Sequence, residues 1–113
     1  MTVRTVCLLE TGYLEASQTT KLTSTGLKTI IDKCTATNSS GSPATIALNL
    51  VPSGGTAGAG NIMLQTKTLA AGESYACPEV VGHTLEAGDF LSGIAGTASA
   101  ITLRVSGRQI TAT

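Results

Sequence analysis

Apolar and polar residues alternate along much of the chain, and this spacing predicts β-strands rather than helices. Successive side chains of a strand point to opposite faces of a sheet, whereas a helical stripe repeats every three or four residues. The alternation is clearest in Ala44–Val51, where the expected inward residues are Ile46, Leu48 and Leu50 and the expected outward ones are Thr45, Ala47 and Asn49. No part of the sequence carries an apolar helical stripe over three turns. The pattern therefore predicts an all-β chain.

Strand-like segments recur between clusters of Gly, Ser, Pro and Asn, which are typical of turns. The expected strands cover residues 2–9, 18–24, 28–38, 44–51, 62–69, 73–77, 90–95 and 100–106, and residues 107–111 are expected to extend the last strand past a bulge. In that last strand Ile101, Leu103 and Val105 are expected to face the core. Strands 28–38 and 44–51, joined by a turn cluster, are predicted to pair as a hairpin.

Asp32 breaks the pattern of the longest expected strand. Ile30, Cys34 and Ala36 fall on one face of this strand, and Asp32 falls on the same apolar face. A carboxylate is costly to bury without partners. Two explanations therefore stay open: the strand bulges at Asp32, or the carboxylate caps a neighbouring turn.

Residues 68–73 and 84–89 share the pattern T-L-x-A-G-acid. The glycines, Gly72 and Gly88, are expected to supply the positive φ of a tight turn. The acids that follow, Glu73 and Asp89, are expected to accept hydrogen bonds from the N–H groups of their own turns. The repeated pattern predicts two similar turns at the ends of a sandwich.

A set of six to eight short strands separated by turns predicts a single domain over residues 1–113 with an antiparallel β-sandwich fold. A jelly roll is the expected topology, because the number of strands is near eight and the connections vary in length. Residues 1–12 are expected to form either the first strand or an extended N-terminal arm.

Charge is unusually sparse, which changes the expected environment of the protein. Only 12% of the residues are charged and the net charge is zero, whereas roughly 25% are charged in a typical soluble domain. A surface of this kind is typical of a protein that functions within an assembly, because fewer ions are desolvated when subunits associate. Zero net charge and 3% aromatic content argue against nucleic-acid binding. No segment has the length of a membrane span or of a signal-peptide core, which indicates synthesis in a reducing cytoplasm.

The three cysteines are odd in number and widely spaced, unlike those of a secreted disulfide scaffold. Cys34 and Cys77 lie in expected strands and are interpreted as small apolar core residues. A single disulfide between them stays open as an alternative.

No pattern of residues supports a catalytic, cofactor-binding or metal site. His83 is the single histidine and is expected in a surface turn, since a metal site needs several ligands. The glycine-rich segment 53–60 lacks the spacing of a phosphate-binding loop and is expected to be a flexible loop. A G-x-S-x-G nucleophile motif is absent from the sequence. The carboxylates that remain for glycoside hydrolysis lack aromatic surroundings: Glu73, Glu79, Glu86 and Asp89. The sequence therefore predicts a protein that is not an enzyme and carries no cofactor.

Three stretches carry a resemblance to a known class of proteins: residues 29–38 (TIIDKCTATN), residues 50–58 (LVPSGGTAG), and the closing run from 85–90 (LEAGDF) to 103–108 (LRVSGR). In their overall residue pattern and in these short stretches of sequence, they resemble small virion structural proteins of tailed bacteriophages, most of all capsid decoration (cement) proteins. The resemblance covers roughly residues 25–111 and transfers no functional residue, since such proteins have no active-site motif.

The resemblance implies a protein of the capsid surface that is made in the bacterial host cytoplasm. Its implied partner is the major capsid protein, which it would bind as a homodimer or homotrimer, without nucleic acid or membrane. Residues 1–12 and the loop 52–61 are expected to make most contacts between subunits. Two alternatives stay open: a tail, collar or baseplate β-domain of the virion, and a small non-viral β-sandwich that binds a ligand.

Overall fold

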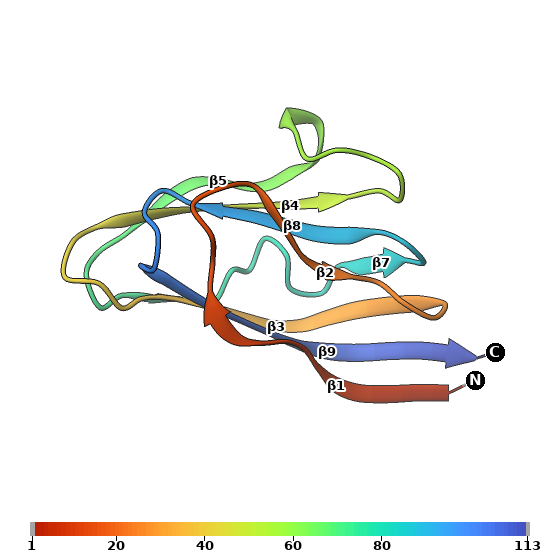
Figure 1. Ribbon diagram of the computed structural model, residues 1–113. Helices are drawn as coiled ribbons and strands as arrows, with labels where there is room; N and C mark the ends of the chain where they lie inside the picture. The colour runs from red at the N-terminus through yellow and green to blue at the C-terminus, as the bar shows by residue number, and fades with distance from the viewer. Residues whose placement is uncertain (1, 113) are drawn as a thin grey trace.

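The computed structural model describes residues 2–112, which form nine β-strands in two antiparallel sheets (Figure 1). In chain order the elements are β1 (Thr2–Tyr13), β2 (Thr19–Thr23), β3 (Lys28–Asn38), β4 (Ala44–Val51), the 3₁₀-helix η1 (Ala59–Asn61), β5 (Ile62–Leu69), β6 (Ser74–Tyr75), β7 (Thr84–Glu86), β8 (Phe90–Ala95) and β9 (Ile101–Ala112). The all-β prediction is confirmed. Within the described residues no helix is long and apolar enough to cross a membrane.

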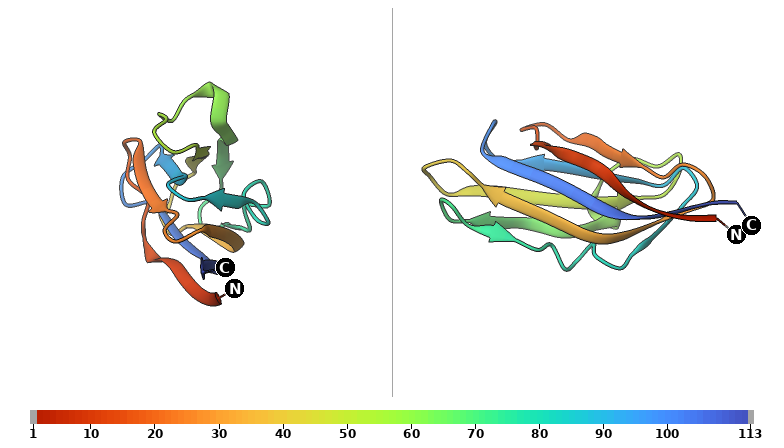
Figure 2. Two further views of the ribbon diagram at one scale, coloured as in Figure 1. Left: turned by 90° about the vertical axis from the view of Figure 1, so that its right-hand side faces the viewer. Right: turned by 90° about the horizontal axis from the view of Figure 1, so that it is seen from below.

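The two sheets pack face to face as a β-sandwich (Figure 2). The first sheet has the order β1-β9-β3, with β6 and β7 both paired to the far side of β3, and the second has the order β2-β8-β4-β5. The molecule measures 47 × 26 × 19 Å, and both termini lie side by side at one end (Figure 1). Aliphatic side chains fill the space between the sheets, the largest being Leu14, Ile31, Ile46, Leu48, Leu69, Leu91, Ile101 and Leu103.

The predicted hairpin of β3 and β4 is wrong. β3 pairs with β9, β6 and β7, whereas β4 pairs with β5 and β8, so the two strands belong to different sheets. Each strand must bury one apolar face. This burial is achieved equally well whether the two strands face each other across the core or lie side by side in one sheet. Alternation therefore predicted which faces are buried but not which edges are paired.

A β-bulge at Asp32 explains the break in the pattern of β3. The register of β3 against β9 shifts between Ile31 and Lys33, so Asp32 is the extra residue. Cys34 and Ala36 are buried as expected, but on the other side of the bulge the buried residue is Ile31, not Ile30. A bulge moves an apolar strand by one residue and therefore exchanges its two faces. The bulge interpretation is confirmed, and Asp32 is exposed.

Near its C-terminal end, the outer face of β4 is covered by the segment that follows it. Ile46 and Leu48 are buried in the core as predicted, and Leu50 packs partly against it. Ala47 and Asn49 lie outside that core but are also buried. The Asn49 side-chain amide donates to the Gly58 carbonyl oxygen at 3.0 Å and to Asn61 Oδ1 at 2.8 Å. The glycine-rich loop, expected to be flexible, is therefore held against the sheet.

β1 is an edge strand and not a free arm, because it pairs with β9 from Thr2 to Tyr13. β9 has no bulge before residue 107, contrary to the expected interruption, and its own extra residue is Thr111, opposite Thr2 and Val3 of β1. Instead its two neighbours bulge beside it, β3 at Asp32 and β1 at Leu8.

Gly107 of β9 lies at the level of both bulges. A Cβ atom at this position would overlap the Ile30 carbonyl oxygen and lie 2.9 Å from Leu8 Cδ1. Only glycine fits between the two bulged neighbours.

We expect Gly107→Ala to lower the free energy of unfolding by about 2–3 kcal/mol, because the added methyl group forces backbone apart in the central strand of the sheet. Gly41→Ala is the matched control, since a Cβ there meets nothing within 4 Å, and we expect a change within about 0.5 kcal/mol. Urea unfolding of both variants measures the difference. Equal midpoints would contradict the steric role of Gly107.

Candidate interaction surfaces

The residues considered for chemistry in the sequence are not assembled into a site. His83 is exposed before β7, where its carbonyl oxygen accepts a hydrogen bond from the Ile31 N–H at 3.1 Å. Within residues 2–112 no group of three or more His, Cys, Asp or Glu side chains is placed to hold a metal ion. The absence of enzymatic activity stays a prediction. The candidates for function are therefore the surfaces of the sandwich.

The two T-L-x-A-G-acid turns have the predicted geometry. Gly72 and Gly88 have φ values of 79° and 88°. Glu73 Oε1 accepts a hydrogen bond from the Ala70 N–H at 2.7 Å, and Asp89 Oδ2 accepts one from the Glu86 N–H at 2.9 Å. Asp89 Oδ1 also accepts from the Ser53 N–H at 2.9 Å, which ties the second turn to the segment after β4.

These turns lie at opposite ends of β3. The Gly72 N–H donates to the carbonyl oxygen of Asn38, the last residue of β3, and the Gly88 N–H donates to that of Ser24, shortly before β3 begins. Each acid thus stabilises its own turn.

One part of the outer face of the first sheet is rich in hydroxyl groups. We call this surface the threonine face; it consists of Thr11, Thr35, Thr37, Thr102 and Arg104, which line one shallow depression. Arg104 Nη1 donates to Thr11 Oγ1 at 3.3 Å, and Thr37 shares a hydrogen bond with Ser74 at 2.9 Å. These contacts leave a flat surface with one cationic side chain.

Beside the threonine face, the bulged residue Asp32 forms an ion pair with Arg108. The guanidinium donates from Nε to Asp32 Oδ2 and from Nη2 to Oδ1, both at 2.9 Å. This hydrogen bonding lowers the pKa of the Asp32 carboxyl below its usual value of 3.8 and raises that of Arg108. The charge that broke the sequence pattern is thus neutralised locally.

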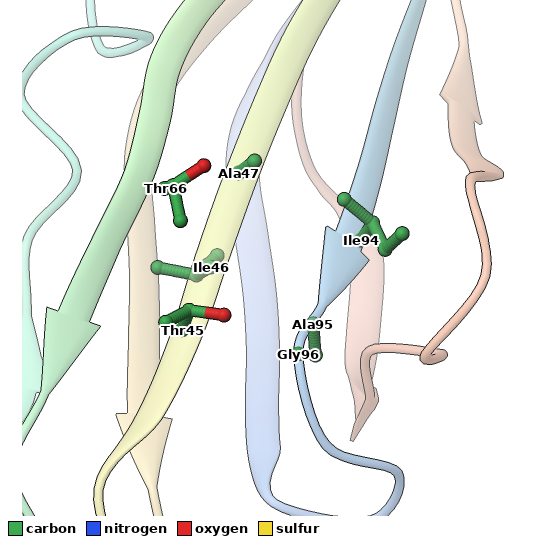
Figure 3. A pocket seen from close by; sticks show the side chains of 7 residues that line it. All are labelled: Thr45, Ile46, Ala47, Thr66, Ile94, Ala95 and Gly96. Atoms are coloured by element: carbon green, nitrogen blue, oxygen red, sulfur yellow. The ribbon is translucent and has the colours of Figure 1, made fainter.

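The outer face of the second sheet carries a shallow groove over β4, between β5 and β8 (Figure 3). Its lining side chains are small or aliphatic: Thr45, Ile46, Ala47, Thr66, Ile94, Ala95 and Gly96. Thr66 has a φ of 44°, a conformation uncommon for a β-branched residue, at a register shift between β4 and β5. An adjoining depression of about 410 Å³ shares Ala47, Thr66 and Ile94 with it.

The edge of β1 concentrates exposed apolar side chains. Val3 and Tyr13 of β1 are 47% and 54% exposed. Leu27 is 40% exposed and lies at the same end of the sheet as Val3, because its N–H donates to the carbonyl oxygen of Ile110, the partner of Val3. β1 has a strand on one side only, so its other edge offers unpaired backbone groups.

Cys34 and Cys77 are fully buried free thiols in the core, which confirms their interpretation as core residues. The two thiols lie within hydrogen-bonding contact. This contact, followed by burial, raises the pKa of the Cys34 thiol. The third cysteine, Cys7, is exposed on β1.

Tyr75 links β6 to the segment that carries Cys77. Its hydroxyl donates to Glu79 Oε2 at 2.6 Å, and this hydrogen bond raises the pKa of Tyr75 to about 12. The Lys67 ammonium, on β5 of the second sheet, lies 4.7 Å from the centre of the Tyr75 ring. Sequence spacing gave no signal for this cluster, because β5 and β6 belong to different sheets.

Comparison with protein-family models, with curated proteins and with solved structures finds no match. The surfaces described above are therefore the features of the molecule that bear on function.

We expect Arg108→Gln to raise the pKa of Asp32 toward its usual value, because the substitution removes the charged hydrogen-bond donor. Arg104→Gln is the control, since Arg104 is on the same strand and its bond goes to Thr11 instead. Carbon-13 NMR titration of the Asp32 carboxyl measures both. Because the folded-state pKa is lowered, the pair stabilises the fold at pH values above the unfolded-state pKa, and this contribution is lost as the pH falls through the folded-state value. An unchanged Asp32 pKa in Arg108→Gln would contradict the ion pair.

Proposed function

We propose that this protein is a structural component of a bacteriophage virion, which decorates the capsid and stabilises it by binding the major capsid protein. The observation that carries the proposal is a sandwich whose outer faces present hydroxyl and methyl groups among few charges, since only 12% of the residues are charged, together with an uncovered edge strand. A partner that lies on such faces meets hydroxyl and methyl groups, so few ions must be desolvated. The resemblance of residues 25–111 to decoration proteins supports the same class.

A jelly-roll topology is part of this proposal and is supported by the strand pairs. β1 pairs with β9, β2 with β8, β3 with both β6 and β7, and β4 with β5. When β6 and β7 are counted as one interrupted strand, eight strands pair first with last, second with second-last, and so on inward. A long antiparallel ribbon rolled into two sheets has this pairing.

The free edge of β1 is the proposed contact with the capsid. An extended segment of the major capsid protein that adds to this edge gains main-chain hydrogen bonds without any need for charge. The exposed side chains of Val3 and Tyr13 flank the same strand and supply apolar contact. The loop 52–61 has a smaller role than the sequence suggested, because part of its hydrogen-bonding capacity is used to cover β4.

Binding of this kind stabilises a shell by mass action. A protein that binds the expanded capsid lattice and not the lattice before expansion shifts the equilibrium toward the expanded state. Homodimers or homotrimers of the protein at symmetry axes would multiply the effect through simultaneous contacts.

The copy number of the protein in purified virions tests this function directly. We expect a ratio to the major capsid protein of one, or a simple fraction of it, by quantitative mass spectrometry. A ratio of a few per cent would instead place the protein in the tail, collar or baseplate. Its absence from virions would overturn the virion proposal and leave the open groove on the second sheet as the starting point for a ligand-binding function.

We further expect Val3→Lys to weaken binding to capsids about tenfold or more, because a lysine on an edge strand opposes the addition of another strand. Met63→Lys is the matched control: Met63 is 36% exposed on β5, an edge strand of the other sheet. Co-sedimentation with capsids that lack the protein measures both variants. Equal binding by Val3→Lys and the wild type would exclude the β1 edge as the contact. A point substitution is preferable to deletion of residues 1–12, which would uncover β9.

A further inference from the structure

The core contains two thiols that the topology places near each other. Ala36 of β3 faces Tyr75 of β6, and Thr37 faces Ser74. The ladder ends at the Ala36–Tyr75 pair, and Cys34 and Cys77 each lie two residues beyond it on the same side. Both cysteine side chains are fully buried in one core cluster.

A disulfide needs two Cα atoms less than about 7 Å apart. Paired residues of antiparallel strands, such as Ala36 and Tyr75, meet this limit, and the two cysteines follow that pair closely along both segments. Cys77 itself has a φ of 48°, so it leaves the regular strand geometry and turns back toward the sheet.

We infer that Cys34 and Cys77 form a disulfide site of the native fold, which closes when a small-molecule disulfide such as oxidised glutathione is supplied. The inference is independent of the proposed function. It concerns the oxidation of the two thiols, which are both free in the reduced protein.

Access to the site runs through the edge of the first sheet. Residues 76–83 form no strand and lie between the short strands β6 and β7. This segment is tied to β3 by two backbone hydrogen bonds, from the Gly82 N–H to the Ile31 carbonyl oxygen and from the Ile31 N–H to the His83 carbonyl oxygen. Short edge segments with few backbone bonds open more readily than central strands. Opening here exposes Cys77 while Cys34 stays on β3.

The reaction proceeds by two thiol–disulfide exchanges. The Cys77 thiol loses its proton in the open state, and its sulfur attacks one sulfur of oxidised glutathione, forming a mixed disulfide and releasing one glutathione thiolate. When the segment closes, the deprotonated Cys34 sulfur attacks the Cys77 sulfur and releases the second glutathione thiolate. The two protons lost by the cysteines are taken up by the two thiolates. The cysteines are oxidised and the glutathione disulfide is reduced to two thiols.

The closed bond links two positions 43 residues apart. Such a link restricts the unfolded chain and therefore favours the folded state.

The experiment uses the Cys7→Ser variant, which removes the exposed thiol and with it any link between molecules. The folded variant is incubated with oxidised glutathione, treated with N-ethylmaleimide, and analysed by intact mass and by tryptic mapping without reduction. We expect a loss of two hydrogens, no maleimide adduct, and a link between the peptides 34–67 and 68–104. We also expect the melting temperature to rise on the order of 10 °C.

Cys7→Ser/Cys34→Ser is the matched control, in which the loss of two hydrogens and the rise in melting temperature should both disappear. If this control fails to fold, the peptide map of Cys7→Ser alone still decides the outcome, since it contains no core substitution. Glutathione or maleimide adducts on both cysteines of the folded protein would overturn the inference. So would a link that forms only in denaturant.

Discussion

The passage of the chain from one sheet to the other at Asn38 governs the arrangement of both sheets. The Asn38 side chain is fully buried, donates to the carbonyl oxygens of Ser42 and Leu69, and accepts from the Ser40 N–H. Its backbone groups bond to Glu73 and Gly72. One residue therefore joins the end of β3, the crossing to β4, the end of β5 and the turn before β6. A buried amide without these partners costs about 1–3 kcal/mol, which disfavours the hairpin that alternation alone allows.

β9 has a central position in the first sheet, where it lies between β1 and β3. Both neighbours bulge near Gly107, where a side chain would overlap them. The bulge on β3 turns Asp32 outward to Arg108 and brings Cys34 onto the buried face. The bulge at Asp32 thus places a charged residue on the outer surface and a thiol in the core.

The proposed function and the inferred disulfide use different parts of this architecture. The proposed association depends on the outer faces of the sandwich and on the free edge of β1, where Val3 and Tyr13 are exposed. The thiol pair lies between the sheets and contributes nothing to those surfaces. Closing it would stiffen the opposite edge of the first sheet, near β6, and leave the β1 edge unchanged. A structural protein of an assembly profits from both properties, because rigid surfaces lose less entropy on binding.

The sequence by itself determined the local features: most strand segments, although not β7, the inward face of Ile101, Leu103 and Val105, and the acid-capped turns at Gly72 and Gly88. These depend on side-chain alternation and on turn chemistry, which act over a few neighbouring residues. Tertiary structure decided the partners of β3 and β4, the burial of Ile31 in place of Ile30, and the meeting of Cys34 with Cys77. It also decided that loop 52–61 covers Asn49. Such features depend on strand pairing between distant segments, and alternation specifies only which face of a strand is buried, never the strand that lies beside it.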